Sequence, residues 1–344
     1  MLRIANAHIN DVTSLRNALQ NALRLEHSTI PPYLCALMTL SGRSASVRYA
    51  RQIIRDIVLE EMLHMALAGN LLNAIGGTPQ INSHDFVLSY PGSLPMGVAG
   101  GLQVHLKRYS CDVVRTVFME IEEPEIPLQI PVMKRMAVGS DEPQTIGEFY
   151  ASIRAEIVRQ GDELFAGADP ARQVTTGFFG MDEEFAVSNV ETAILAIDTI
   201  VEQGEGTPKS PVDLQGDIAH YYRFQELEKG MKLVADPASP IRFSFDPDQQ
   251  IMIDETADVI QMIDDPQLFV FGSAHKRAAQ LAHECDRIYS KMLNALHQAF
   301  NGKPEKLGDA IGTMFEFRNV AEELLQQPVN DGQFAGPCFR HVPV

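Results

Sequence analysis

The spacing of apolar residues in the first quarter of the chain predicts two long helices joined by a short turn. Apolar positions recur at steps of three and four over residues 11–40 and again over residues 47–75, the period of an amphipathic helix. The six residues SGRSAS separate the two segments, so the helices should form an antiparallel hairpin. Gly76 and Pro79 follow the second segment and are expected to end it.

The rest of the chain predicts more helices with long irregular connections. Residues 80–143 are broken by proline and glycine, and within them only residues 110–121 have a helical pattern. Residues 236–272 are rich in Pro and Asp and are expected to be irregular. Further helices are expected at residues 145–165, 182–202, 211–233, 275–300 and 304–327. Strand-like alternation is scarce, so the predicted fold class is all-α.

Carboxylates and an imidazole interrupt the apolar stripes of the first two helices. Glu26 is the one charged residue on its stripe, and Glu61 and His64 lie on the stripe of the second helix. Burying an unpaired carboxylate costs several kcal/mol, so a metal cation or a basic side chain must compensate each one. Glu26 and Glu61 are equally distant from the centre of the turn, so an antiparallel hairpin should place them opposite each other.

This arrangement is half of a ferritin-type dinuclear metal site. In such sites a Glu on one helix faces a Glu-x-x-His motif on its neighbour. The sequence contains a second acid-x-x-His spacing, Asp217 to His220, which we expect to contribute to the other half. Pairing of Glu26 and Glu61 with basic residues is the alternative interpretation.

The carboxylate that completes the second half-site is less well defined. The helix before Asp217 carries an acidic stripe that faces either the site or the solvent. Glu202 is the preferred candidate on this stripe. The other candidates are Asp198, Glu205 and, at the start of an earlier helix, Glu148.

Net charge indicates which classes of partner are disfavoured, and targeting signals and cysteine spacing indicate the cellular location. The chain has 344 residues, and 28 basic against 45 acidic side chains give a net charge of −17, which disfavours nucleic acid and anionic membrane surfaces. No signal peptide or bilayer-spanning apolar run is evident, so a cytoplasmic location is expected. The four cysteines are scattered without CxxC spacing, which favours reduced thiols.

Several longer motifs resemble the ferritin-like domain of iminophenylpyruvate dimer synthases, which are related to imine-coupling enzymes of violacein- and rebeccamycin-type pigment pathways. These motifs are LEHSTIPPYL, EEMLHMALAGNLLNAIGGTP, VEQGEG, HYYRF, MLNALHQAFNGKPEKLGDAIGTM and AGPCF. The resemblance implies a ferritin-like four-helix bundle with a long crossover and an additional C-terminal helical hairpin. It also implies metal ligands at Glu26, Glu61, His64, Glu202, Asp217 and His220, where Asp217 replaces the usual, longer Glu.

These observations lead to two hypotheses about function. The first is a non-haem dinuclear oxidoreductase that binds two iron ions, or manganese or zinc, and uses O2 on a small organic, amino-acid-derived substrate. The alternative is a non-catalytic ferritin-like protein with a metal-binding, structural or interaction role. We expect residues 1–235 to form the bundle, with a crossover insertion at about 80–143, and residues 236–344 to pack on it. Self-association into a homo-oligomer is compatible with either hypothesis.

Overall fold

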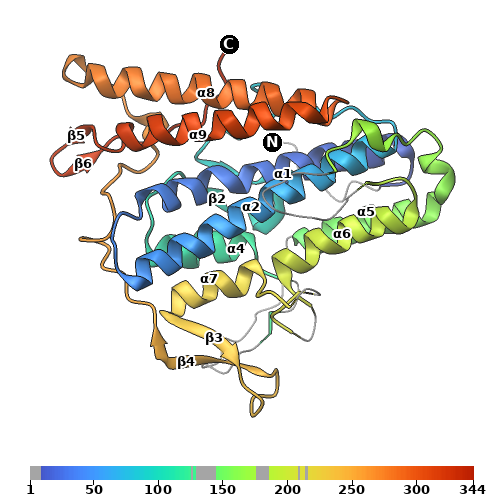
Figure 1. The fold of residues 1–344 in the computed structure, drawn as a ribbon, viewed down its shortest axis with the longest axis horizontal. Helices are drawn as coiled ribbons and strands as arrows, with labels where there is room; N and C mark the ends of the chain where they lie inside the picture. Colours follow the sequence, from blue (N-terminus) through green and yellow to red (C-terminus); the bar gives the residue numbers. More distant parts are fainter. Residues whose placement is uncertain (1–8, 125–126, 129–144, 176–185, 208–209, 214–215) are drawn as a thin grey trace.

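The computed structural model describes residues 9–124, 127–128, 145–175, 186–207, 210–213 and 216–344. Its centre is the expected hairpin of α1 (Val12–Thr39) and α2 (Ala45–Ala74), whose helices lie side by side along most of their length (Figure 1). Asp11 and Ser44 cap the two helices by accepting hydrogen bonds from backbone N–H groups of the first turn. The bounds agree with the expected helices to within two residues.

The chain then crosses the outside of this hairpin in short elements. β1 (Gly92–Ser93) pairs antiparallel with β2 (Gln103–Val104), and the 3-10 segment η1 (Pro95–Gly101) lies between them. The helical stretch expected at residues 110–121 consists of α3 (Cys111–Val113), the π-helical turn η2 (Val114–Phe118) and α4 (Met119–Ile121). It ends directly before Glu122.

Two further helices and a short one complete the layer on this side. α5 (Ile146–Gln160) and α6 (Val190–Glu205) contact each other, with the 3-10 turns η3 (Asp162–Phe165) and η4 (Pro170–Arg172) between them. α7 (His220–Lys229) follows and contacts α2, α6 and η2. The helix expected from residue 182 begins only at Val190, because Asn189 caps it, so the prediction is wrong for residues 186–189. Residues 182–185 lie outside the described residues.

The predicted helix over residues 211–233 is wrong at both ends. α7 covers only its middle. Before the helix, Val212 pairs with Ile218 in an isolated β-bridge, and after it Gly230 adopts a left-handed conformation (φ 64°) that ends the helix.

β3 (Met231–Ala235) then pairs antiparallel with β4 (Phe243–Gln250), so the segment expected to be irregular contains a strand. Register across this hairpin shifts between Met231 and Lys232. Asp246, Pro247 and Asp248 lie within β4, and these residue types are more typical of loops than of strands.

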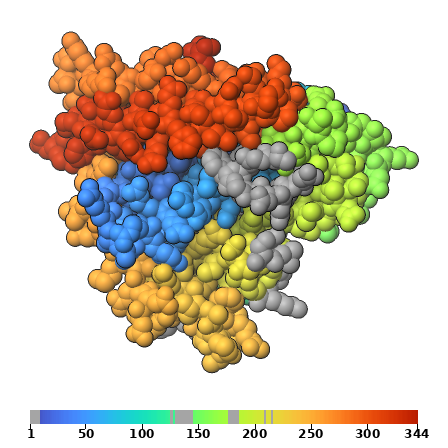
Figure 2. All heavy atoms as spheres, viewed as in Figure 1, coloured from blue at the N-terminus to red at the C-terminus, as the bar shows by residue number. Residues whose placement is uncertain are grey.

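A second long hairpin covers the opposite side of α1 and α2. It consists of α8 (Lys276–Phe300) and α9 (Leu307–Leu324), flanked by the 3-10 turns η5 (Pro266–Leu268), η6 (Ser273–His275) and η7 (Pro304–Lys306). β5 (Pro328–Asn330) and β6 (Gln333–Phe334) form a small antiparallel ribbon at its end. Figures 1 and 2 show the α8–α9 hairpin lying along one side of the α1–α2 hairpin, where α8 contacts α2.

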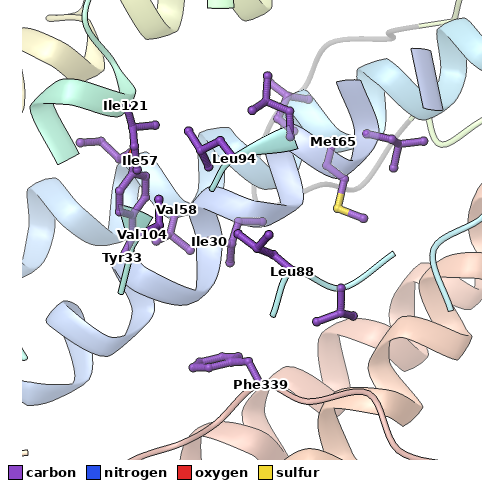
Figure 3. Close-up of a cluster of buried hydrophobic side chains, with 14 of the residues drawn as sticks. Ile30, Tyr33, Ile57, Val58, Met65, Leu88, Leu94, Val104, Ile121 and Phe339 are labelled. Atoms are coloured by element: carbon purple, nitrogen blue, oxygen red, sulfur yellow. The ribbon is translucent and has the colours of Figure 1, made fainter. Parts of the chain in front are cut away.

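One continuous apolar core joins these layers. Buried side chains from α1, α2, the crossover and the last segment pack together, as Figure 3 shows for Tyr33, Ile57, Leu94 and Phe339. All four cysteines are free thiols. Among the described residues, no helix combines the length and apolar character needed to cross a bilayer.

Candidate metal centre

The α1–α2 hairpin brings three buried polar side chains together inside the apolar core. Glu26, Glu61 and His64 each expose 3% or less of their surface. One potential ligand atom from each lies within 4.8 Å of the others, as equal spacing from the turn predicts. Nδ1 of His64 is 3.6 Å from Glu26 Oε2 and 3.7 Å from Glu61 Oε1.

A second group shares Glu61 with the first. Glu61, Glu122 and His220 also offer ligand atoms within 4.8 Å of one another. Nδ1 of His220 lies 2.9 Å from Glu61 Oε1 and 3.5 Å from Glu122 Oε2. The rings of His64 and His220 are 5.5 Å apart between centroids and nearly parallel, so both imidazoles face the same carboxylate.

Each of the three carboxylates is held by a hydroxyl group on one oxygen only. The Tyr150 hydroxyl donates to Glu26 Oε1 at 2.5 Å, and the Tyr33 hydroxyl donates to Glu122 Oε1 at 2.5 Å. Thr29 donates to Glu61 Oε2 at 2.8 Å. Burial and nearby carboxylates raise the pKa of both tyrosines well above the usual value, so their hydroxyls remain protonated donors. In each carboxylate the other oxygen faces a histidine.

The two histidines are oriented by partners on their far side. Nε2 of His64 is 2.9 Å from Gln203 Oε1, and Nε2 of His220 is 2.7 Å from Glu60 Oε2. Both partners are acceptors, so each Nε2 carries the proton and a neutral ring has its lone pair on Nδ1. Arg223 contacts Glu60 at 3.0 Å and keeps that carboxylate in place.

Burial and neighbouring charges raise the pKa values of Glu61 and His220, so both groups tend to keep a proton when no metal ion is bound. Burial and the charge of Glu122 raise the pKa of Glu61 to about 7, although both histidines oppose this shift. Burial lowers the pKa of His220, but its contacts with Glu122, Glu60 and Glu61 outweigh burial and raise the pKa well above the usual value. A metal ion must therefore displace protons from the site.

Comparison with known proteins places this fold in a family. The sequence model of the Ferritin-like family matches residues 19–229, more than half of the chain. The chain belongs to the ferritin-like family. A ferritin-like protein from Caulobacter vibrioides has a similar solved structure, with a TM-score of 0.58 and 19% sequence identity, over 89% of this chain and 95% of that one. Comparison with curated proteins gives no match.

Ferritin-like domains often hold two iron ions between carboxylates and histidines of their helices. The three carboxylates and two histidines of the two groups described above are donors of the same kinds. Metal–ligand bonds of about 2.1 Å place neighbouring donor atoms about 3 Å apart, close to the separations around Glu61. Nδ1 of His220 is buried without a hydrogen-bond partner, because Glu61 Oε1 lies off the direction that such a bond requires. A cation would satisfy this atom and the three carboxylates together.

Glu202 does not lie in either group of this ferritin-like site. The buried residues of α6 are Ala193, Ala196, Ile197, Ile200 and Gly204. The acidic stripe lies on another face, where Asp198 pairs with Arg154 at 3.4 Å and Glu202 is half-buried. The residue of α6 that faces the site was predicted one position too early. Gln203, not Glu202, contacts His64. Gly204 lies close to Glu122, since a Cβ added to it would be 3.7 Å from Glu122 Oε2.

The other proposed carboxylates also lie elsewhere. Asp217 is exposed; its carbonyl accepts from the Asp213 backbone N–H, and its own N–H donates to Asp213 Oδ1. It lies outside the site because α7 begins only at His220, so the three-residue spacing from Asp217 to His220 is not helical. Glu205 accepts a hydrogen bond from the Gly147 backbone, and Glu148 is an exposed member of the α5 capping box.

Two residues of the candidate centre were not predicted from the sequence. Glu122 follows Val114 and Phe118 at steps of four, a stripe that could have identified it inside the crossover. Glu60, next to Glu61 in the sequence, was also not predicted. His220 and Arg223 both contact Glu60. Their spacing of three residues places them on one face of α7, which could have indicated a shared acidic partner.

Proposed function

We propose that this ferritin-like protein binds two metal ions, iron in the first place, at the paired groups centred on Glu61. Glu26 and His64 would hold one ion, Glu122 and His220 the other, and Glu61 would bridge them. The single observation that carries the proposal is that one oxygen of each buried carboxylate is fixed by a hydroxyl while the other faces an imidazole Nδ1. We assign α1, α2, α3–α4 and α7 as the helices of the ferritin-type bundle around these ions.

We propose further that the site supports oxidation chemistry. Carboxylate oxygens with imidazole nitrogens suit iron and manganese, and a pair of such ions supplies O2 activation when bound. The residues of the chain exclude water, fix the donors and hold protons on Tyr33 and Tyr150 beside the carboxylates. The sequence resemblance to iminophenylpyruvate dimer synthases supports a small, amino-acid-derived organic substrate.

Anaerobic loading of the metal-free protein with Fe(II) tests this proposal. We expect about two ions per chain and O2 consumption when air is admitted. Glu61→Gln should reduce binding to both positions, because it removes the anionic charge shared by the two groups. Glu202→Gln and Asp217→Asn should leave the stoichiometry unchanged and serve as matched controls.

The outcomes separate the two hypotheses. Two bound ions without O2 consumption would support the non-catalytic alternative and contradict the oxidoreductase. No bound metal, or loss of metal in Glu202→Gln but not in Glu61→Gln, would contradict the site itself.

A further inference from the structure

A large cavity lies between the two long hairpins. It has a volume of about 750 Å³ and is lined by residues of α1, α2, α8 and α9, together with Phe339. This volume falls in the range of small-molecule sites, about 300–1,000 Å³. The cavity faces α8 and α9, whereas Glu26 contacts Tyr150 of α5 and Glu61 contacts His220 of α7. The hairpin α1–α2 therefore separates the cavity from the metal centre.

The walls of the cavity are apolar and adaptable. Leu34, Val58, Leu293 and Ile311 represent the four helices that line it. Five methionines also contribute: Met38, Met62, Met65, Met292 and Met314. Thioether side chains are flexible and polarisable, so such walls suit an extended apolar ligand of variable shape.

The charged groups of the cavity are arginines at one end. Arg48, Arg51 and Arg55 follow each other at steps of three and four on α2, so they share one face of the helix. Arg318 of α9 joins them, and Glu322 is the one acidic residue among the lining side chains. A concentration of positive charge on a chain of net charge −17 indicates an anionic partner.

These arginines are not equally engaged. Arg55 pairs with Asp56 at 2.8 Å, Arg318 pairs with Glu322 at 2.7 Å, and Arg48 donates to a backbone carbonyl. Within the described part of the chain, the exposed side chain of Arg51 makes neither a hydrogen bond nor an ion pair. Its guanidinium is therefore available to a carboxylate.

Among the residues that the structure describes, the wall of the cavity also contains one buried polar atom without a partner. His27 is 3% exposed, and its Nε2 lies 2.6 Å from the Tyr289 hydroxyl. Its Nδ1 is buried and has no hydrogen-bond partner among the described residues. A water molecule retained beside the apolar part of a bound molecule would satisfy this atom.

We propose that the cavity binds an amphipathic carboxylic acid, of which a fatty acid is the simplest example. The apolar chain lies between the hairpins and the carboxylate meets Arg51 at the arginine end. The α2 residues from Arg51 to Met65 span about 21 Å at a rise of 1.5 Å per residue, which accommodates an extended dodecanoate.

A tryptophan reporter tests this proposal. The chain contains no tryptophan, so Met314→Trp on α9 introduces a single fluorophore into the cavity wall. We expect 12-bromododecanoate, below its micellar concentration, to quench the emission saturably. Dodecanoate should compete, dodecanol should compete about tenfold less well, and dodecyltrimethylammonium should compete least.

Charge reversal at the arginine end provides the specific control. Arg51→Glu in the reporter protein should weaken binding of 12-bromododecanoate by about fivefold or more. Arg287→Glu changes an arginine of α8 that pairs with Glu284 and does not line the cavity, so affinity should stay unchanged. In the unmodified protein, dodecanoate should raise the unfolding temperature, and Arg51→Glu should diminish this shift.

Three results would overturn the proposal. Equal affinity for the acid, the alcohol and the ammonium compound would mean that charge plays no role. Absence of both quenching and thermal stabilisation would mean that no such ligand binds. Concentration-dependent dimerisation that protects the reporter from quenching would assign the cavity to an interface between two copies of the chain.

Discussion

At the scale of single residues, the candidate centre depends on side chains that hold the ligands as well as on the ligands. Thr29, Tyr33 and Tyr150 each fix one carboxylate oxygen, which leaves the other free for a cation. Gln203 and Glu60 select the protonated nitrogen of the two histidines. Such partners orient ligands before metal binds, so less free energy is spent on ordering them.

Glu60→Gln tests the role of the carboxylate behind His220. His220 and Arg223 outweigh burial and lower the pKa of Glu60 to about 2, so Glu60 is anionic in the folded protein. We expect the change to reduce metal affinity at the Glu122–His220 position by about 10–100-fold. The Glu26–His64 position should change far less, so a Co(II) titration followed by absorbance should become clearly biphasic. Equal weakening at both positions would show a general folding defect.

The pH dependence of the metal-free protein tests the protons held at Glu61. Its pKa is about 7 in the folded state against an ordinary value of 4.5, because of burial and the charge of Glu122. The folded state thus binds more protons than the unfolded state in this window, so this group favours folding as pH falls from 7 to 4.5.

Glu61→Gln isolates that contribution from other titrating groups. The metal-free variant should be more stable than the metal-free parent at pH 8, and the difference in unfolding free energy should shrink towards zero near pH 4.5. Urea unfolding at several pH values measures it. Burial lowers the pKa of His27 to about 3 and acts in the opposite direction, but it is common to both proteins. A difference that grows as pH falls would contradict the assignment.

At the scale of elements, long periodic segments were predictable and short or shifted ones were not. The hairpin α1–α2 followed from apolar spacing, turn length and caps, and with it the meeting of Glu26, Glu61 and His64. In the second half, His220 joins the group, but Glu202 does not, because the acidic stripe of α6 is as periodic as its buried face. Periodicity alone does not say which face is buried, and α7 begins too late to present Asp217.

Phe300→Ala tests whether the C-terminal hairpin and the helices around the centre unfold as one unit. Phe300 is 1% exposed at the end of α8 and lies against Gly69 of α2, where an added Cβ would contact its ring at 3.4 Å. We expect a loss of about 3–5 kcal/mol in unfolding free energy. Phe315→Ala on α9 is the matched control, because Phe315 is 60% exposed and should matter little.

Two probes decide the outcome of that experiment. Helix content and the absorbance of bound Co(II) should be lost in one transition, shifted equally by Phe300→Ala. A shift in helix content that leaves the Co(II) transition unchanged would instead support residues 236–344 as an independent unit beside the bundle.

At the scale of the whole molecule, a hydrophobic core shared by both hairpins surrounds a small, highly polar centre. Three carboxylates and two imidazoles lie buried at that centre, in a chain whose similarity to a ferritin-like structure extends over 89% of its length. Without a cation, burial of these carboxylates opposes folding. Under the proposed function, two cations would convert the same residues into a rigid set of donors between α1, α2, α4 and α7.

The central claim is that Glu61 bridges two metal ions, and anomalous diffraction from crystals grown with Fe(II) tests it most directly. The account predicts two iron peaks about 3.5–4 Å apart, with Glu61 between them, His64 on one and His220 on the other. A single peak, or iron bound by Glu202 or Asp217 in place of Glu122, would contradict it.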